Sequence, residues 1–322
     1  MSWDVVLYDG NGPGGAFAPN WNKSKPTGGT EVHMVQLAEG LAAAGLKVLG
    51  ISAISTPEYH GATYLPAGDP LPVCKALVTC GISQVPVGVR TDRHAVLWTH
   101  DPANGILPLM EHLRYSDFVC VSQWQASRFP LGFRTHVIPA IIDDWIYELG
   151  DRPLEKRRAK FVCLSAWWKG SMDTLILWEE LKREKNASRL AELHMGSPYS
   201  HPPAAQQIVE RAGCTWVPLH KPADVVEQMK DAAGVFRVCK FPETFGATDV
   251  IAQILGCRVH VLALNGIGAL HETLASPVGV TAERRVFDRN FRFGYGNPPD
   301  TTRKDYRART IIPRWIDLLR LR

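Results

Sequence analysis

The sequence predicts an α/β protein with two doubly wound domains, each built on a parallel sheet. Two observations lead to this prediction. Apolar, strand-like runs alternate with helical patterns from end to end, and the alternation is interrupted once, between residues 141 and 159. Parallel strands joined by helices require right-handed crossovers, which place helices on both faces of the sheet. A chain of 322 residues is long enough for two such domains.

The first half opens with an apolar strand at 4–8, and a glycine-rich stretch from Gly10 to Gly29 follows it. Residues 30–44 are expected to form a helix, because apolar side chains recur there at spacings of three and four. Gly45 is expected to end this helix. The next buried strand is expected at 47–52, and further strands, with helices between them, are expected at 95–98, 117–121 and 135–138.

The interruption at 141–159 contains paired aspartates, Pro153 and a basic run, and it marks the predicted domain boundary. The predicted domains are therefore 1–145 and 146–305, followed by a C-terminal crossover helix at 306–322. In the second domain, strands are expected at 160–164, 190–194, 215–217, 235–239 and 258–262, and helices at 172–183, 204–211, 222–230 and 247–255. Residues 288–303 are expected to form a loop.

Composition excludes several classes of protein. Apolar residues make up 45% and charged residues 21% of the chain, which is typical of a soluble globular protein. No apolar run approaches the ~20 residues of a membrane span. The start lacks the pattern of a signal peptide, and the seven cysteines show no metal-ligand spacing, so a reduced, cytoplasmic protein without a metal is expected.

The net charge of +4 does not suggest nucleic-acid binding. The densest basic run, residues 156–160, is interpreted as a solvated linker face, and a weak peripheral contact with the inner face of a membrane is left open. Residues 10–15 contain a literal G-x-G-x-x-G, but the prolines at 19 and 26 do not allow the helix that a dinucleotide site needs. A loop over a ligand cleft is the better interpretation.

Strand-to-helix turns carry the candidate binding residues. Gly28 and Gly29 precede a helix whose free N–H groups suit a phosphate or sugar oxygen, although Thr30 could simply cap this helix. Glu243 stands before a glycine turn onto another helix, where a carboxylate can accept hydrogen bonds from a sugar and N–H groups can hold a phosphate. A capping role for this segment is the alternative.

Two further turns contribute candidates. Lys169 can reach a diphosphate as a point charge, and Trp167 or Trp168 could stack on a base or sugar, with packing between domains as the alternative. His100 follows a first-domain strand, where it is either a cleft residue or a structural one. The sequence has no Asp-x-Asp, so a metal-bridged diphosphate site is not supported.

Taken in order, these segments resemble the GT-B glycosyltransferases, specifically the retaining group that includes sucrose synthase-like and lipopolysaccharide glycosyltransferases (family 4-like, group 1). The resemblance spans about residues 5–275. It rests on the segments 28–33, 45–48, 121–124, 137–143, 169–170, 242–246, 256–259 and 265–268, together with Gly196 and Glu272.

The resemblance implies two Rossmann-like domains facing across a cleft, a C-terminal helix that returns toward the first domain, and metal-independent transfer of a sugar. Glu243 would hold hydroxyl groups of the donor sugar, Lys169 would neutralise the leaving diphosphate, and His100 would line the cleft. The remaining implied positions are Gly28, Gly29, Gly170, Phe245, Gly246, Ala247 and Thr248 for the donor phosphates, and Trp167, Trp168, Gly196 and Val217 for the base or sugar.

Two departures from the family's pattern bear on activity. The family usually has a second glutamate eight positions after the first, and here that position is Ile251, with Asp249 and Gln253 as the nearest polar residues. The family also has an arginine some five residues before its lysine, and Leu164 and its neighbours supply none.

The predicted function is a retaining glycosyltransferase that uses a nucleotide-diphosphate sugar, with UDP- and GDP-sugars favoured, and an acceptor that is a glycan, a lipid or a small metabolite. The alternatives are a non-catalytic protein of the same fold that binds a nucleotide, a sugar or a partner, and a sugar-nucleotide epimerase or phosphorylase. The sequence does not identify the oligomeric state.

Overall fold

The computed structural model describes residues 2–9, 29–51, 56–66, 73–80, 91–100, 115, 117–150, 158–184, 191–197, 201–275, 277, 279–291 and 304–321. Contacts within the chain divide the described residues into two compact units. Unit 1 comprises those from 2 to 143 and from 305 to 321, and unit 2 comprises those from 144 to 304. The predicted domain boundaries at 145/146 and 305/306 stay a prediction.

Unit 1 is built on a sheet that has eight strands among the described residues, in the order β3-β4-β2-β1-β5-β6-β7-β8. Its neighbouring strands are parallel except for the pair β3 and β4. The strands are β1 (Trp3–Asp9), β2 (Val48–Ile51), β3 (Thr56–Tyr59), β4 (Ala62–Leu65), β5 (Cys74–Cys80), β6 (Thr91–Thr99), β7 (Asp117–Cys120) and β8 (Thr135–Val137).

The sequence predicted no element between residues 52 and 95. In the part of this segment that the structure describes, the chain forms the hairpin β3–β4 and the inner strand β5. The hairpin turns at His60 and Gly61, whose positive φ angles of 49° and 80° suit a two-residue turn between antiparallel strands. Strand β5 is buried along nearly its whole length, so its sequence lacks the alternation that identifies a half-buried strand.

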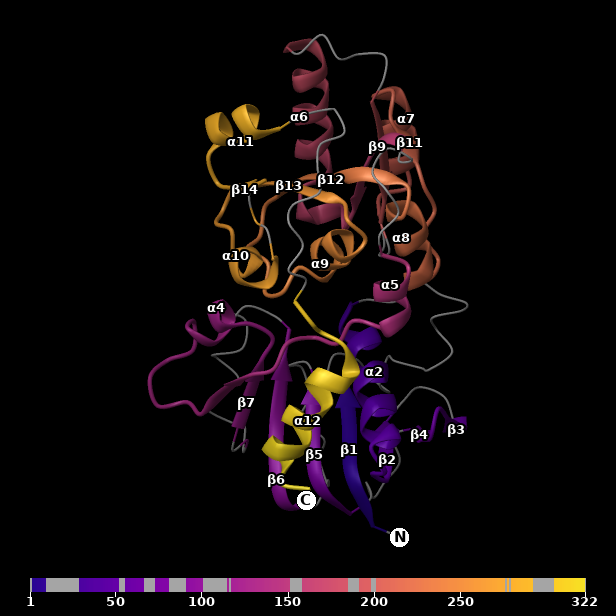
Figure 1. Ribbon diagram of the computed structural model, residues 1–322, viewed down its shortest axis with the longest axis vertical. Coiled ribbons are helices and arrows are strands. Elements are labelled where there is room, and N and C mark those ends of the chain that lie inside the picture. The colour runs from indigo at the N-terminus through magenta and orange to yellow at the C-terminus, as the bar shows by residue number, and fades with distance from the viewer. Residues whose placement is uncertain are drawn as a thin grey trace. The chain divides into compact units, whose positions relative to one another are not determined.

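Unit 1 has helices α2 (Gly29–Ala43), α4 (Gln123–Ala126) and α12 (Ala308–Leu319) among its described residues. The C-terminal helix α12 packs on α2 within this unit, so the chain returns to its first unit as expected (Figure 1). Gly40 permits the close approach, because a Cβ there would collide with the Ile312 side chain. One turn further along, α12 buries Trp315, whose ring lies 5.1 Å from that of Trp98 on β6.

Unit 2 contains a parallel sheet with six strands among the described residues, in the order β11-β10-β9-β12-β13-β14. This order corresponds to 3-2-1-4-5-6, the doubly wound arrangement of nucleotide-binding domains. The strands are β9 (Arg158–Leu164), β10 (Glu192–Gly196), β11 (Thr215–Trp216), β12 (Ala232–Cys239), β13 (Arg258–Ala263) and β14 (Val280–Thr281).

The helices of unit 2 alternate with its strands as predicted, and three further helices were not predicted from the sequence. Helix α5 lies in the segment interpreted as a domain boundary, α10 follows β13, and α11 overlaps the start of the predicted loop. The segments are α5 (Asp144–Glu148), the 3-10 turn η3 (Trp167–Lys169), α6 (Ser171–Glu184), α7 (Ala205–Arg211), α8 (Pro222–Met229), α9 (Ala247–Ile254), α10 (Leu270–Thr273) and α11 (Arg284–Asn290).

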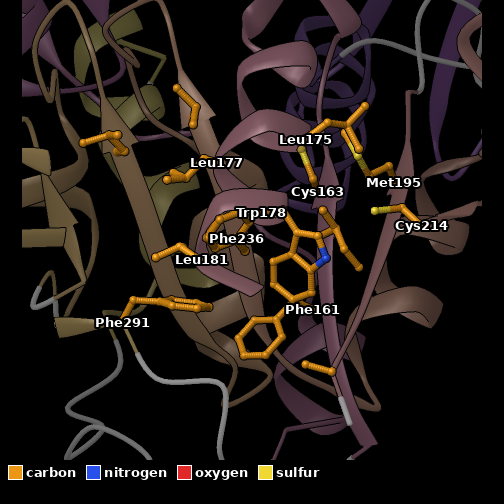
Figure 2. Close-up of a cluster of buried hydrophobic side chains, with 14 of the residues drawn as sticks. Phe161, Cys163, Leu175, Leu177, Trp178, Leu181, Met195, Cys214, Phe236 and Phe291 are labelled. Carbon is orange, nitrogen blue, oxygen red and sulfur yellow. The ribbon is translucent and has the colours of Figure 1, made fainter. Parts of the chain in front are cut away.

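The core of unit 2 lies between one face of its sheet and the helices that cover it. Figure 2 shows Trp178 of α6 packed among Phe161 of β9, Phe236 of β12 and Phe291. The rings of Trp178 and Phe236 meet edge to face, with centroids 5.1 Å apart. Burial of such large aromatic side chains fixes the sheet on which the loops at its carboxyl edge are mounted. All seven cysteines of the chain are buried, and each is a thiol.

Candidate functional site

The strand order of unit 2 reverses between β9 and β12, which are adjacent in the sheet although two strands of the sequence separate them. In open α/β sheets ligands bind outside the carboxyl ends of the strands at such a reversal, because the flanking loops leave in opposite directions. The segment after β9 contains Lys169, and the segment after β12 contains Glu243. Both candidate residues therefore lie at the position where the fold favours a ligand.

The turn that carries Lys169 is fixed to the end of β12. The Lys240 N–H donates to the Lys169 carbonyl at 2.8 Å. Gly170 has a φ of 126°, and a Cβ there would lie 2.5 Å from the Val238 carbonyl oxygen. Only glycine fits this position without strain, because the conformation is left-handed and the β12 backbone fills the space of a side chain.

The turn that carries Glu243 is held in a similar way. Glu243 forms an isolated parallel bridge with Gly268, and the Ala269 N–H donates to the Glu243 carbonyl at 2.7 Å. Gly246 follows in a left-handed conformation with a φ of 76°, and α9 begins at Ala247 without a side-chain cap. The first N–H groups of a helix have no acceptor within that helix, so Ala247 and Thr248 present donors next to Glu243.

Four charged side chains meet at this position. The Lys169 Nζ lies 3.3 Å and 3.2 Å from the two carboxylate oxygens of Glu243. The Arg237 Nη1 lies 3.2 Å from the Glu243 Oε1, and the same guanidinium pairs through Nε and Nη2 with the carboxylate of Asp249. The Glu243 side chain thus contacts two cations, and Arg237 contacts two carboxylates. We call Lys169, Arg237, Glu243 and Asp249 the charge cluster.

Burial and charge act against each other in this cluster. Burial alone would raise the pKa of Glu243, but Lys169 and Arg237 outweigh it and hold that pKa below its usual value. Burial also works against the charge of the Lys169 ammonium, and the Glu243 carboxylate outweighs it, so the pKa of Lys169 is raised. Both side chains are therefore ionised at neutral pH, and the cluster offers a fixed hydrogen-bond acceptor beside a cation.

A second polar group lies in unit 1, at the start of α2 and the end of β6. The rings of His33 and His100 stack with centroids 5.3 Å apart. The Nδ1 of His33 donates to the Gln36 side chain at 3.0 Å, and the Gln36 amide donates to Asp143 at 2.6 Å. Burial, together with the charge of His33, holds the pKa of His100 well below its usual value, so His100 is neutral at pH 7.

The remaining predicted positions divide between the two units. Gly29 begins α2 in unit 1, and Gly28 lies outside the described residues. In unit 2, Gly196 ends β10, and a Cβ there would lie 2.5 Å from the Val217 carbonyl oxygen, so close packing of the strands alone accounts for this glycine. Trp167 packs against the core of unit 2, whereas the Trp168 side chain is half exposed. Phe245 is buried.

The two departures from the family's pattern have structural counterparts. Asp249 is completely buried against Arg237, and the Gln253 side chain accepts a hydrogen bond from the Ala275 N–H at 2.5 Å. Both side chains are thus engaged inside unit 2, as expected from their offset along α9 relative to Ile251. Neither takes over the position of the second glutamate.

Arg237 is the site residue that the sequence reasoning missed. It lies within the buried strand β12, and its side chain is only 2% exposed. A signal was present, because arginine is almost never fully buried unless it is paired, and here it interrupts the apolar run Val235–Cys239. The sequence could not tell which carboxylates pair with it, since Glu243 and Asp249 are brought to it by a turn and a helix.

Two general features of the described residues also bear on function. In the part of the chain that the structure describes, no group of three or more His, Cys, Asp and Glu side chains could hold a metal ion. Within that same part, none of the helices has the length and apolar character needed to cross a membrane.

Two doubly wound units, together with a C-terminal helix that returns to unit 1, define a chain of the GT-B fold. Solved structures of this architecture match the chain over nearly its whole length. AviGT4, a glycosyltransferase involved in avilamycin A biosynthesis, is 17% identical with a TM-score of 0.65, and the match covers 99% of this chain and 97% of that one.

Two further structures give the same result. A glycosyltransferase from Rickettsia africae is 15% identical, with a TM-score of 0.63 and coverage of 99% of this chain and 98% of that one. Anabaena HepE in complex with UDP-glucose is 13% identical, with a TM-score of 0.63 and coverage of 99% and 100%. Identities of this size show the fold alone. No protein-family model and no curated protein matches the chain.

Proposed function

We propose that the chain is a glycosyltransferase that transfers a sugar, with retention of configuration, from a nucleotide-diphosphate sugar. The observation that carries this proposal is the pairing of Lys169 with Glu243 at the strand reversal of unit 2, beside the open N-terminus of α9. A cation, a fixed carboxylate and free N–H groups at one sheet edge suit a ligand that carries both phosphates and hydroxyl groups.

Each member of the site has a separate task in the proposed reaction. Glu243 accepts hydrogen bonds from hydroxyl groups of the donor sugar. Lys169 and the N–H groups of Gly246, Ala247 and Thr248 bind the diphosphate. Charge builds on this diphosphate as it leaves an oxocarbenium-like sugar, so these donors stabilise the transition state more than the ground state.

His100 is assigned to the sugar or acceptor, since a neutral imidazole in unit 1 can donate or accept a hydrogen bond without bringing a charge. The proposed reaction uses no metal and no protein nucleophile. Trp168 and Val217 stay candidates for contacts with the base. We propose UDP as the first nucleotide to test, because HepE, which has a similar fold, binds UDP and UDP-glucose. The acceptor is proposed only as a glycan, a lipid or a small metabolite.

A non-catalytic protein of the same fold is the second candidate. One observation favours it: no acidic side chain stands at Ile251, and the nearest one, Asp249, is engaged with Arg237. Such a protein would hold a nucleotide, a sugar or a partner without transferring anything. The two candidates differ in turnover, so binding and chemistry must be measured separately.

The first experiment is calorimetric titration of the chain with UDP, GDP, ADP, CDP and dTDP. We expect one of them to bind at micromolar strength. The matching nucleotide sugar should then release its nucleoside diphosphate slowly, even without the acceptor. No binding across the panel by the folded protein would contradict the donor site, and binding without release would favour the non-catalytic alternative.

Glu243→Gln provides the matched control, because it keeps the size of the side chain and removes its charge. We expect release from the nucleotide sugar to fall by about 100-fold or more, because hydrogen bonds to sugar hydroxyls that strengthen in the transition state supply several kcal/mol. Binding of the free nucleoside diphosphate should persist, since Glu243 is assigned to the sugar. Unchanged turnover would remove Glu243 from the site.

A further inference from the structure

The two cations that contact Glu243 differ in their freedom to move. The Lys169 side chain is 35% exposed and stands on a four-carbon stem, whereas the Arg237 side chain is 2% exposed. Arg237 also belongs to the inner strand β12, which is hydrogen-bonded to β9 and β13 on its two sides. Lys169 can therefore leave Glu243 by rotating its side chain, and Arg237 cannot.

Asp249 fixes the orientation of the Arg237 guanidinium. The Arg237 Nε lies 3.2 Å from the Asp249 Oδ1, and the Nη2 contacts the Asp249 Oδ2, which is a two-point contact with a fully buried carboxylate. The third nitrogen, Nη1, forms an ion pair with the Glu243 Oε1 at 3.2 Å, without the geometry of a hydrogen bond. Because the guanidinium is planar, holding two of its nitrogens sets the position of the third, and with it the distance of the cation from Glu243.

We propose that Arg237, anchored by Asp249, is a positioning residue that keeps Glu243 charged and in place while Lys169 exchanges that carboxylate for an anionic diphosphate. The exchange rests on the proposed function, which supplies the diphosphate. The positioning by Arg237 rests on the contacts alone. In this arrangement one cation serves the arriving ligand, and the other serves the carboxylate that remains.

The need for the second cation follows from burial. The Glu243 side chain is 12% exposed, and a buried carboxylate without a cation becomes protonated rather than staying charged. A protonated Glu243 would lose one of its about four acceptor sites, and one oxygen would carry a donor in its place. The thiol of Cys239 also faces it, 3.7 Å from the Glu243 Oε1, and burial raises the pKa of that thiol so that it stays neutral.

The test reads the protonation of Glu243 directly, by ¹³C NMR of protein labelled at the glutamate side-chain carboxyl and assigned with Glu243→Gln. In Lys169→Ala we expect Glu243 to stay ionised at pH 7, because Arg237 remains. In Lys169→Ala combined with Arg237→Met and Asp249→Asn we expect it to be protonated. Protonation in Lys169→Ala alone, or a charged Glu243 in the combined variant, would overturn the role of Arg237.

Arg237 and Asp249 are replaced together because removing one member of a buried pair leaves an uncompensated charge that could unfold unit 2. The pair variant without the lysine change then tests the exchange, with inorganic pyrophosphate as the probe. On saturation with pyrophosphate, Glu243 should stay ionised in the wild-type protein and become protonated in Arg237→Met/Asp249→Asn. A Glu243 signal that does not change in this variant would overturn the exchange.

The two proposals can fail separately. If pyrophosphate does not bind to the wild-type protein, the exchange is overturned and the diphosphate site of the proposed function fails with it. The comparison of Lys169→Ala with the combined variant needs no ligand, so it still decides whether Arg237 holds the charge of Glu243. Thermal melting of Arg237→Met/Asp249→Asn beside the wild type provides the folding control, because this variant removes both charges of the buried pair.

Discussion

Lys169 has two anionic partners in the proposed site, the Glu243 carboxylate that it contacts in the structure and the diphosphate of the donor. A lysine suits this double use because its ammonium is a point charge on a flexible stem, with no fixed geometry to satisfy. Arg237 has the opposite character, since its guanidinium is buried and held at two points. Lys169 therefore provides a mobile charge in the site, and Arg237 provides a fixed one.

Lys169→Ala should weaken binding of a nucleoside diphosphate far more than binding of the corresponding monophosphate. Loss of a charge-assisted contact of about 1.5–3 kcal/mol corresponds to roughly 10- to 150-fold in affinity. Calorimetric titration with the two nucleotides measures the difference. Lys240→Ala is the matched control, because this lysine pairs with Asp173 at 2.8 Å outside the charge cluster. Equal losses for both nucleotides would show that Lys169 is not a diphosphate ligand.

Glu39 on α2 predicts a pH dependence of unit 1. Burial, and then the charge of Asp143, raise the pKa of Glu39 from 4.5 to about 7. An acid whose folded-state pKa is raised contributes stability below its unfolded pKa and loses that contribution as the pH rises through the folded value. Glu39→Gln removes this loss, so it should melt a few degrees above the wild type at pH 8 and close to it at pH 5. The same difference at both pH values would contradict the assignment.

At the scale of elements, hydrophobic periodicity predicted where helices and single strands lie. It did not predict which strands pair with one another. The helical patterns at 30–44, 172–183 and 247–255 appear as α2, α6 and α9 with ends shifted by one residue. The hairpin β3–β4 and the strand β5 were missed. Short edge strands and fully buried strands carry no period that distinguishes them, so their partners in the sheet decide their conformation.

At the contact between α2 and α12, helix propensity and packing have opposite effects on the stability of an alanine variant. Alanine favours an isolated helix over glycine by about 1 kcal/mol, yet a Cβ at Gly40 would collide with Ile312 on α12. We therefore expect Gly40→Ala to lower the free energy of unfolding of unit 1 by about 1–3 kcal/mol. Chemical denaturation measures this change.

Ile312→Ala supplies the partner variant for a double-mutant cycle. With the larger side chain removed, Gly40→Ala should cost less than it does in the wild type, because the colliding atoms are absent. The two changes should therefore be coupled by more than about 0.5 kcal/mol. Additive effects would mean that the two helices do not pack at Gly40.

At the scale of the whole molecule, each unit has its own core and its own sheet, so damage to one core should remain in that unit. Trp315 of α12 and Trp98 of β6 are both fully buried in unit 1. We expect Trp315→Ala to cost about 3–5 kcal/mol. Amide hydrogen exchange should become faster in β6 and remain unchanged in β12 of unit 2.

Trp168→Ala is the matched control for this prediction, because Trp168 lies in unit 2 and is half exposed. Its removal should change the free energy of unfolding by much less than that of Trp315, since little apolar surface leaves the core. Faster exchange in β12 after Trp315→Ala would contradict the independence of the two cores.

The sequence by itself determined the α/β class, the presence of two doubly wound domains and the candidate binding residues at the ends of strands. Hydrophobic spacing and glycine turns, on which these predictions rest, are local properties of the chain. It also singled out Lys169 and Glu243, which stand 74 positions apart. Their contact requires β9 and β12 to be neighbours in the sheet, and the order of the strands along the sequence does not specify this. Only the tertiary structure decided that Arg237 belongs to the charge cluster, because its partners come from a separate turn and helix.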